Sequence, residues 1–247
     1  MSVVVITGGS RGIGAATALL AAQKGYSVVV NYKGNKAAAS QVVEKITAAG
    51  ARAIAVAGDV GVEADVVRLF DTTLSEFGRL DALVNNAGIL APHMTLEHMT
   101  ADRISRVLNT NILGSMLCAR EAVRHMATEN GGNGGSIVNL SSIAAKLGSP
   151  NEYIDYAASK GAIDTFTVGL AVEVAGSGIR VNAVRPGVIY TEIHATGGEP
   201  ERVDRVKHSV PMQRGGTAEE VAQSVLWVMS EDASYTTGAL IDVSGGR

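Results

Sequence analysis

The chain has 247 residues with a net charge of −3, and 46% of its residues are apolar. This length and apolar content suffice for one large core, and the absence of a basic stripe excludes nucleic acid as an expected partner. No apolar run approaches the roughly 18 residues of a membrane helix, so no membrane contact is expected. The single cysteine, Cys118, and an N-terminus that does not read as a signal peptide favour a reducing, cytoplasmic setting.

Short β-branched runs alternate with Ala-rich stretches of helical spacing. Strands are expected at 3–7, 27–32, 52–58, 80–86, 135–142, 179–186 and 239–245. Helices are expected near 12–24, 36–49, 62–77, 100–128, 155–175 and 217–230. Nearly all-apolar strands alternating with helices are typical of a parallel sheet covered on both faces. The sequence therefore predicts a single-domain α/β Rossmann fold over 1–247, with a doubly wound seven-stranded parallel sheet.

The first predicted strand leads through glycines directly into a helix, in the stretch VVVITGGSRGIGAATALLAAQKG. Gly8, Gly12 and Gly14 follow the spacing G-x-x-x-G-x-G, which differs from the G-x-G-x-x-G dinucleotide fingerprint. The physical logic is shared, because glycines permit a tight turn and a close approach of the backbone to a pyrophosphate. The positive end of the following helix then attracts that anion. The alternative is an ordinary strand–helix turn.

The end of the second predicted strand, VVVNYKGNK, carries no carboxylate. An acidic residue at this point would bind the ribose 2′-hydroxyl of NAD, so its absence favours NADP(H). Arg11 in the glycine loop, with Asn31 and Lys33, is expected to hold a 2′-phosphate. The alternative is that Arg11 and Lys33 are solvated surface charges.

The segment YIDYAASKGA, residues 153–162, places a tyrosine and a lysine one helical turn apart. Only Tyr156 has a lysine at i+4, Lys160, whereas Tyr153 has Ala157 there. A cation close to a phenol lowers its pKa from about 10, toward the pH at which an acid–base group works best. On spacing alone, an exposed pair without function is the alternative reading.

Several ordered motifs together resemble the short-chain dehydrogenase/reductase family. They are TGGSRGIG (7–14), GDV (58–60), NNAG (85–88), NTNILG around Asn111, NLSS (139–142), YAASK (156–160) and RPGVIYT (185–191). The resemblance covers essentially the whole chain. It points to NADP-preferring oxidoreductases similar to bacterial glucose dehydrogenases and 3-oxoacyl-carrier-protein reductases.

The resemblance implies a role for each matching residue. Tyr156 would be the acid–base group with Lys160 as its partner, Ser142 would bind the substrate oxygen, and Asn111 would help to hold a proton-relay water. Ser142 and Tyr156 are fourteen residues apart, one more than in the commonest family pattern, and Ser141 is the neighbouring alternative. The expected cofactor-binding residues are Gly8, Ser10, Arg11, Gly12, Ile13, Gly14, Asn31, Tyr32, Lys33, Asp59, Val60, Asn86, Ala87, Gly88, Tyr156, Lys160, Pro186, Gly187, Ile189 and Thr191.

The predicted function is an NADP(H)-dependent oxidoreductase that moves a hydride between nicotinamide and a small carbonyl or secondary-alcohol substrate. A 3-oxoacyl-carrier-protein reductase and a glucose-type sugar dehydrogenase are the alternatives within this class. A non-catalytic NADP-binding sensor or scaffold is the alternative of another class. The Ser–Tyr–Lys set argues against it, because a sensor has no need of that set.

Residues 188–216 follow the sixth strand, have mixed polarity and are expected to form a substrate lid with a short helix near 199–208. His194, Met212 and Glu192 are expected to approach a substrate there. The histidines show no metal-ligand spacing, so no metal site is predicted. The resemblance also implies a homotetramer. The predicted helices at 100–128 and 155–175 support it, because both are apolar around much of their circumference.

Overall fold

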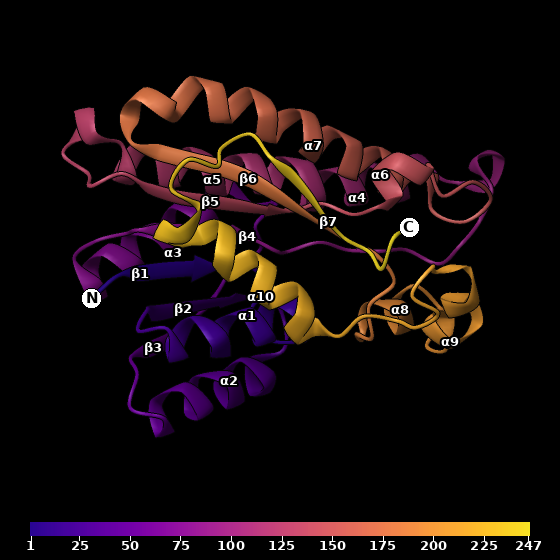
Figure 1. Cartoon of the computed structure of the whole chain (residues 1–247), viewed down its shortest axis with the longest axis horizontal. Helices are drawn as coiled ribbons and strands as arrows, with labels where there is room; N and C mark the ends of the chain where they lie inside the picture. The colour runs from indigo at the N-terminus through magenta and orange to yellow at the C-terminus, as the bar shows by residue number, and fades with distance from the viewer.

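Seven short β-branched runs pair side by side in the computed structural model, which describes every residue from Met1 to Arg247. The strands are β1 (Val3–Ile6), β2 (Ser27–Tyr32), β3 (Ala53–Ala57), β4 (Ala82–Asn85), β5 (Gly135–Leu140), β6 (Ile179–Pro186) and β7 (Leu240–Val243). Their order is β3-β2-β1-β4-β5-β6-β7, and all neighbours are parallel (Figure 1). The predicted fold class is confirmed. Strand order reverses between β1 and β4, the point where open α/β sheets bind ligands.

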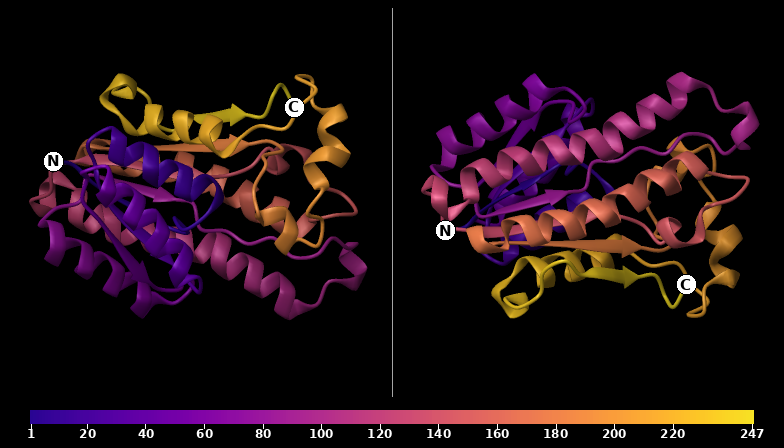
Figure 2. Two further views of the ribbon diagram at one scale, coloured as in Figure 1. Left: turned by 90° about the horizontal axis from the view of Figure 1, so that it is seen from below. Right: turned by 90° about the horizontal axis from the view of Figure 1, so that it is seen from above.

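Helices cover both faces of the sheet, as Figure 2 shows from opposite sides. One layer holds α1 (Gly12–Gln23), α2 (Lys36–Ala48) and α10 (Ala218–Met229), and the other holds α3 (Glu63–Phe77), α5 (Gly114–Met126) and α7 (Ile154–Val174). Side chains alternate along each strand, so Val4 and Ile6 pack on the first layer while Val3 and Val5 pack on the second. This double burial explains why the strands are mostly apolar, and why β1 is apolar throughout.

Local sequence sets several helix ends. The Asn35 side chain accepts a hydrogen bond from the Ala38 N–H at 3.0 Å and so caps α2. Thr217 and Glu220 form a reciprocal capping box at the start of α10. Gly78 ends α3 in the left-handed conformation that glycine adopts without steric cost. These ends lie close to the predicted ones because their signals are local.

The predicted helix at 100–128 is interrupted, and this part of the prediction is wrong. It consists of α4 (Ala101–Leu108), a π-helical turn η2 (Asn109–Leu113) and α5. The π turn inserts an extra residue into the helical winding, a feature that recurs at functional sites. Asn111 lies in this turn and is fully buried.

Further short helices complete the chain. The prediction did not include α6 (Ala144–Leu147), which is too short to show a period of its own. The expected lid contains α8 (Ile193–Thr196), α9 (Arg202–Val206) and a 3₁₀ turn, η5 (Lys207–Ser209). The remaining 3₁₀ turns are η1 (Leu96–His98), η3 (Thr128–Asn130), η4 (Ala175–Ser177) and η6 (Glu231–Ala233).

The lid lies beyond the carboxyl ends of the strands, on the same side of the molecule as α6 (Figure 1). It has a small apolar cluster of its own, made of Val188, Val203 and Val210. The fold thus places a separately packed segment over the sheet edge where the strand order reverses. None of the helices combines the length and apolarity needed to cross a bilayer.

Candidate active site

Two connected cavities lie at the carboxyl edge of the sheet. A groove of about 550 Å³ runs along the glycine loop and the ends of β2 and β3. A second cavity of about 520 Å³ lies between β5, α7 and the lid. Six residues line both cavities: Ile13, Asn86, Gly88, Leu90, Thr191 and Ile193. A ligand in the groove can therefore reach a ligand in the second cavity.

The glycine loop is packed too tightly for side chains. Gly8 and Gly12 have φ values of +60° and +53°, in the left-handed region that favours glycine. A Cβ on Gly14 would lie 2.4 Å from the Gly8 carbonyl oxygen and 2.5 Å from Asn86 Nδ2. Asn86 Nδ2 donates to the carbonyls of Thr7 and Gly8 at 2.9 and 3.0 Å, which fixes the loop. The backbone therefore opens onto the groove at the N-terminus of α1, where a pyrophosphate fits.

The far end of the groove differs from the expectation for a 2′-phosphate site. Asn31 is 2% exposed, and its Nδ2 donates to the carbonyls of Val56 and Gly58 at 3.3 and 3.0 Å. Its amide therefore ties β2 to β3 and is not free to bind an anion. Lys33 Nζ lies 2.6 Å from Asp59 Oδ2 at the surface. Arg11 is the exposed cation that lines the groove without such a bond in the chain.

The other expected cofactor residues line the two cavities. Ser10, Tyr32, Asp59, Val60, Ala87 and Gly88 line the groove, and Pro186, Gly187 and Ile189 line the second cavity. Gly187 leaves room for β7, because a Cβ there would lie 2.7 Å from Ser244 Cα. Thr191 closes on the glycine loop, with its methyl group 3.3 Å from where a Gly12 Cβ would stand. The sequence motifs thus converge on one edge of the sheet.

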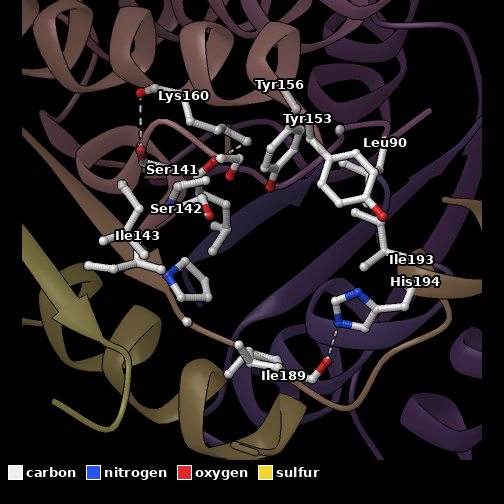
Figure 3. A pocket seen from close by; sticks show the side chains of 18 of the residues that line it. Leu90, Ser141, Ser142, Ile143, Tyr153, Tyr156, Lys160, Ile189, Ile193 and His194 are labelled. Atoms are coloured by element: carbon white, nitrogen blue, oxygen red, sulfur yellow. Dashed lines mark hydrogen bonds between the residues drawn. The ribbon is translucent and has the colours of Figure 1, made fainter. Parts of the chain in front are cut away.

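Ser142, Tyr156 and Lys160 meet in the second cavity, as Figure 3 shows. Ser142 follows β5, and the other two residues project from the first turns of α7. Ser142 lies close enough to the phenol to lower the pKa of Tyr156, whereas Ser141 Oγ donates to the Lys160 carbonyl at 3.1 Å. Of the two neighbouring serines, Ser142 is therefore the one that acts on the phenol.

The expected lowering of the Tyr156 pKa by Lys160 is wrong for this structure. Burial of the phenol raises the pKa of Tyr156, and Ser142 offsets this only in part. Lys160 Nζ lies 5.6 Å from the centre of the Tyr156 ring and donates to the Leu140 carbonyl at 2.6 Å. The same burial lowers the pKa of Lys160 to about 8. Desolvation thus favours the uncharged form of both groups.

Asn111 joins the site through the π turn. Its Oδ1 accepts from the Ile89 N–H at 2.8 Å, and its Nδ2 donates to the Ile89 carbonyl at 3.1 Å. Nδ2 also donates to Ser159 Oγ at 3.0 Å. A Cβ on Gly88 would lie 3.5 Å from Asn111 Oδ1 and 3.6 Å from Lys160 Nζ, so both polar groups border the same glycine.

The lid supplies polar residues that local sequence spacing did not reveal. Arg202 Nη2 lies 2.5 Å from Glu152 Oε2, and Nη1 lies 3.0 Å from Glu199 Oε2. Arg205 adds bonds to Glu152 at 3.3 Å and to Glu199 at 2.8 Å. We call these four residues the lid latch, because they join α9 to the loop before α7. Tyr153 belongs to the same wall, since its hydroxyl donates to Glu199 at 3.2 Å and its ring stacks under Arg202.

Of the three lid residues expected near a substrate, only one lines the second cavity. His194 does so, and its Nε2 donates to the Ile189 carbonyl at 2.9 Å, while burial lowers its pKa and keeps it neutral. Glu192 lines the groove instead. Met212 lies outside both cavities and is 59% exposed. The expectation for Met212 is therefore wrong, because Met212 packs along the C-terminal segment, where its N–H donates to the Gly245 carbonyl at 3.1 Å.

The extra residue between Ser142 and Tyr156 is taken up in the loop after α6. Ser149 and Asn151 have positive φ values, 44° and 63°, which are uncommon for residues with a side chain. The loop leaves Ser142 and Tyr156 in the lining of the same cavity. It also presents Glu152 to the lid latch.

Comparison with known proteins identifies the family. Residues 8–247 match the family model described as Enoyl-(Acyl carrier protein) reductase. The chain is 60% identical over 247 residues to the uncharacterized oxidoreductase YgfF of Escherichia coli, with both chains fully covered. It is 37% identical over 242 residues to glucose 1-dehydrogenase 2 of Bacillus subtilis, covering 98% of this chain and 93% of the relative.

Solved structures agree with this assignment. A 3-ketoacyl-(acyl-carrier-protein) reductase from Brucella melitensis, complexed with NADH, superposes with a TM-score of 0.92 at 35% identity, covering 100% of this chain and 98% of the other. A short chain dehydrogenase from Burkholderia cenocepacia, in complex with NADP, gives 0.90 at 34% identity, covering 99% and 97%. The chain belongs to the short-chain dehydrogenase/reductase family. It is an oxidoreductase, and the comparisons support a nicotinamide cofactor.

Proposed function

We propose that the protein is an NADP(H)-dependent oxidoreductase that interconverts a carbonyl and a secondary alcohol, with Tyr156 as the acid–base group. The observation that carries the proposal is the meeting of Ser142, Tyr156 and Lys160 in a cavity that opens onto the glycine-loop groove. When bound, the nicotinamide supplies or accepts the hydride. The chain's own residues bind the substrate, orient it and move its proton.

In the reducing direction, Tyr156 donates the phenolic proton to the oxygen that gains negative charge. A raised pKa keeps the phenol protonated at neutral pH, which suits a proton donor. Ser142 directs its hydroxyl to the same oxygen, where a fixed dipole is most effective. Lys160 is the cation from which the phenol can be reprotonated, because its own pKa of about 8 lies near working pH. Asn111 is proposed to hold the water of this proton relay.

The groove fits NADP(H) through residues of the glycine loop. The close-packed backbone at Gly14 accepts a pyrophosphate, and Arg11 supplies the charge for a 2′-phosphate. Lys33 can join it only by leaving Asp59. The absence of a carboxylate at the end of β2 supports the preference for NADP over NAD.

The second cavity supports a compact, uncharged carbonyl substrate. Apolar residues such as Leu90, Leu147 and Ile193 contribute to its lining, and the charges of the lid latch are mutually paired. Reduction of a 3-oxoacyl chain and oxidation of a sugar are the alternatives suggested by two relatives. We also place the protein in the cytoplasm, in keeping with its buried, unpaired Cys118.

We further propose a homotetramer. Leu113 and Met116 at the start of α5 are exposed, as are Val168 and Val172 on α7, and Val172 is 79% exposed. The two helices lie side by side on one face of the sheet (Figure 2). A second copy of the chain would cover this apolar surface. Light scattering during size exclusion should give four times the 25.4 kDa of one chain, and the mass of a single chain would contradict the proposal.

A substrate panel with NADPH and NADP⁺, followed by nicotinamide absorbance, tests the enzymatic function. Compact ketones, 3-oxoacyl thioesters and sugars form its three arms. Tyr156→Phe should lower kcat by more than about 10²-fold while NADPH binding is retained, because only the proton donor is lost. NADPH binding without turnover in all three arms would favour the non-catalytic sensor, and near-normal kcat in Tyr156→Phe would refute the mechanism.

A further inference from the structure

A buried ion pair joins α4 to α7 outside both cavities. Arg103 Nε lies 2.9 Å from Asp155 Oδ2, and Arg103 Nη2 lies 3.3 Å from Asp155 Oδ1. The two side chains are only 7% and 2% exposed. Burying two charges carries a large desolvation cost, and well-packed apolar residues are often as stable or more so. Stability alone therefore gives a weak account of this pair.

Asp155 also holds the backbone of the next residue. Its Oδ1 accepts a hydrogen bond from the Tyr156 N–H at 2.9 Å. Tyr156 is the third residue of α7, so its N–H precedes the first intrahelical bond, which runs from the Ala157 N–H to Tyr153. The Tyr156 carbonyl accepts from Ser159 Oγ at 2.7 Å. Side chains thus hold both polar backbone atoms of the proposed acid–base residue.

The hydrogen bond at the Tyr156 N–H and the one at its carbonyl each continue, through further bonds, to the segment between β4 and α4. Arg103 Nη1 donates to the Pro92 carbonyl. Ser159 accepts from Asn111, which bonds both polar backbone atoms of Ile89. Leu90 lies between these anchor points and lines both cavities. The bonds therefore link the position of Tyr156 to the wall shared by the two cavities.

We propose that Arg103 and Asp155 are positioning residues, which fix the Tyr156 backbone relative to Leu90 and so align the phenol with the substrate oxygen. This inference rests on the proposed function, because it assigns the pair to the turnover that Tyr156 carries out. A merely structural pair would change the stability of the protein and leave the turnover of each folded molecule unchanged.

The test replaces the pair by apolar side chains in R103M/D155L, which avoids leaving one buried charge alone. The kcat per folded, NADPH-binding molecule should fall by about tenfold or more, since a misplacement of about 1 Å can cost about 10²-fold. The KM for NADPH should stay within about twofold of wild type, because neither residue lines the groove. The kinetic isotope effect with NADPH deuterated at C4 should rise as the chemical step becomes slower.

D155N and R106M are the companion variants. D155N keeps an oxygen for the Tyr156 N–H and should lose less kcat than R103M/D155L. Arg106 is an exposed arginine of the same helix, so R106M should leave kcat unchanged. An unchanged kcat and isotope effect in R103M/D155L, with only the melting temperature altered, would overturn the positioning role.

Hydrogen exchange at the Tyr156 amide, resolved by NMR, gives a readout that needs no substrate. Exchange should be faster in R103M/D155L than in wild type and R106M. If the wild-type protein turns over no substrate but exchange is still faster in R103M/D155L, the proposed function fails, whereas the bond from the Tyr156 N–H to Asp155 is supported. If exchange is equal in all three proteins, Asp155 does not hold this amide and the inference is wrong.

Discussion

Lys160→Met should make the protein more stable while it abolishes turnover. Burial lowers the pKa of Lys160 from an ordinary 10.5 to about 8. Each pH unit by which a pKa moves corresponds to about 1.4 kcal/mol. The lowered pKa of Lys160 therefore reduces the free energy of unfolding at neutral pH by about 3 kcal/mol. Methionine also leaves the Leu140 carbonyl without its 2.6 Å partner, which costs about 1–2 kcal/mol. The net gain at pH 7 is about 1–2 kcal/mol.

The stability difference between Lys160→Met and wild type should depend on pH. Between about pH 8 and 10.5 the folded chain binds fewer protons at Lys160 than the unfolded chain, so wild-type stability rises with pH across this window. The advantage of Lys160→Met should be full below about pH 8, fall to zero at about pH 9, and become a loss of about 1–2 kcal/mol by about pH 10.5, because the unpaired Leu140 carbonyl remains. Urea unfolding of both proteins at pH 7 and pH 10 measures the difference, and the exposed Lys36→Met serves as the control. A Lys160→Met protein that is less stable than wild type at pH 7, or a stability difference that is equal at both pH values, would refute the reasoning.

Three other predictions concern the cofactor and the lid. Arg11→Ala should lower the NADPH-to-NADH ratio of kcat/KM at least about tenfold, whereas equal loss with both would assign Arg11 to the shared pyrophosphate. Gly14→Ala should abolish NADPH binding in a fluorescence titration, because the new Cβ would stand 2.4 Å from the Gly8 carbonyl oxygen. The control is Gly176→Ala, whose Cβ would meet no atom within 4 Å, and this variant should bind NADPH normally. Glu152→Gln should weaken the lid latch and so speed proteolysis within residues 193–209. The control is Glu201→Gln, a change at an exposed glutamate of the lid. Equal cleavage rates in the two variants would show that the latch does not hold the lid.

Sequence alone was sufficient for the sheet and its covering helices. Mostly apolar runs of four to eight residues and helical stretches between them are local signals, and strands buried on both faces require such runs. The π turn at Asn109–Leu113 was missed because one extra residue hardly disturbs the apolar spacing of residues 100–128. The helix at Ala144–Leu147 is held by its neighbours and leaves no periodic pattern.

The residues of the site likewise include some that local sequence revealed and others that only the packing determines. Tyr156 and Lys160 share one helix, so their spacing revealed them as a pair. The bond between Glu152 and Arg202 joins residues fifty positions apart, and nothing in either local sequence indicates the other. Asn31 lines the groove as predicted for a cofactor-binding residue, but the sequence did not show that its amide donates to the carbonyls of Val56 and Gly58, because only the packing of β3 determines this.

The strand order also determines when the centre of the sheet can form during synthesis. Val4 pairs with Ala82, so β1 acquires its second neighbour only after nearly eighty further residues have been made. At about 5–20 residues per second, that interval is roughly 4–16 s. Throughout this interval the all-apolar strand β1 has at least one unpaired edge, which can add a strand of another chain. The parallel connectivity that builds the cavities therefore leaves the newly made N-terminal half with an unpaired apolar strand edge during this interval.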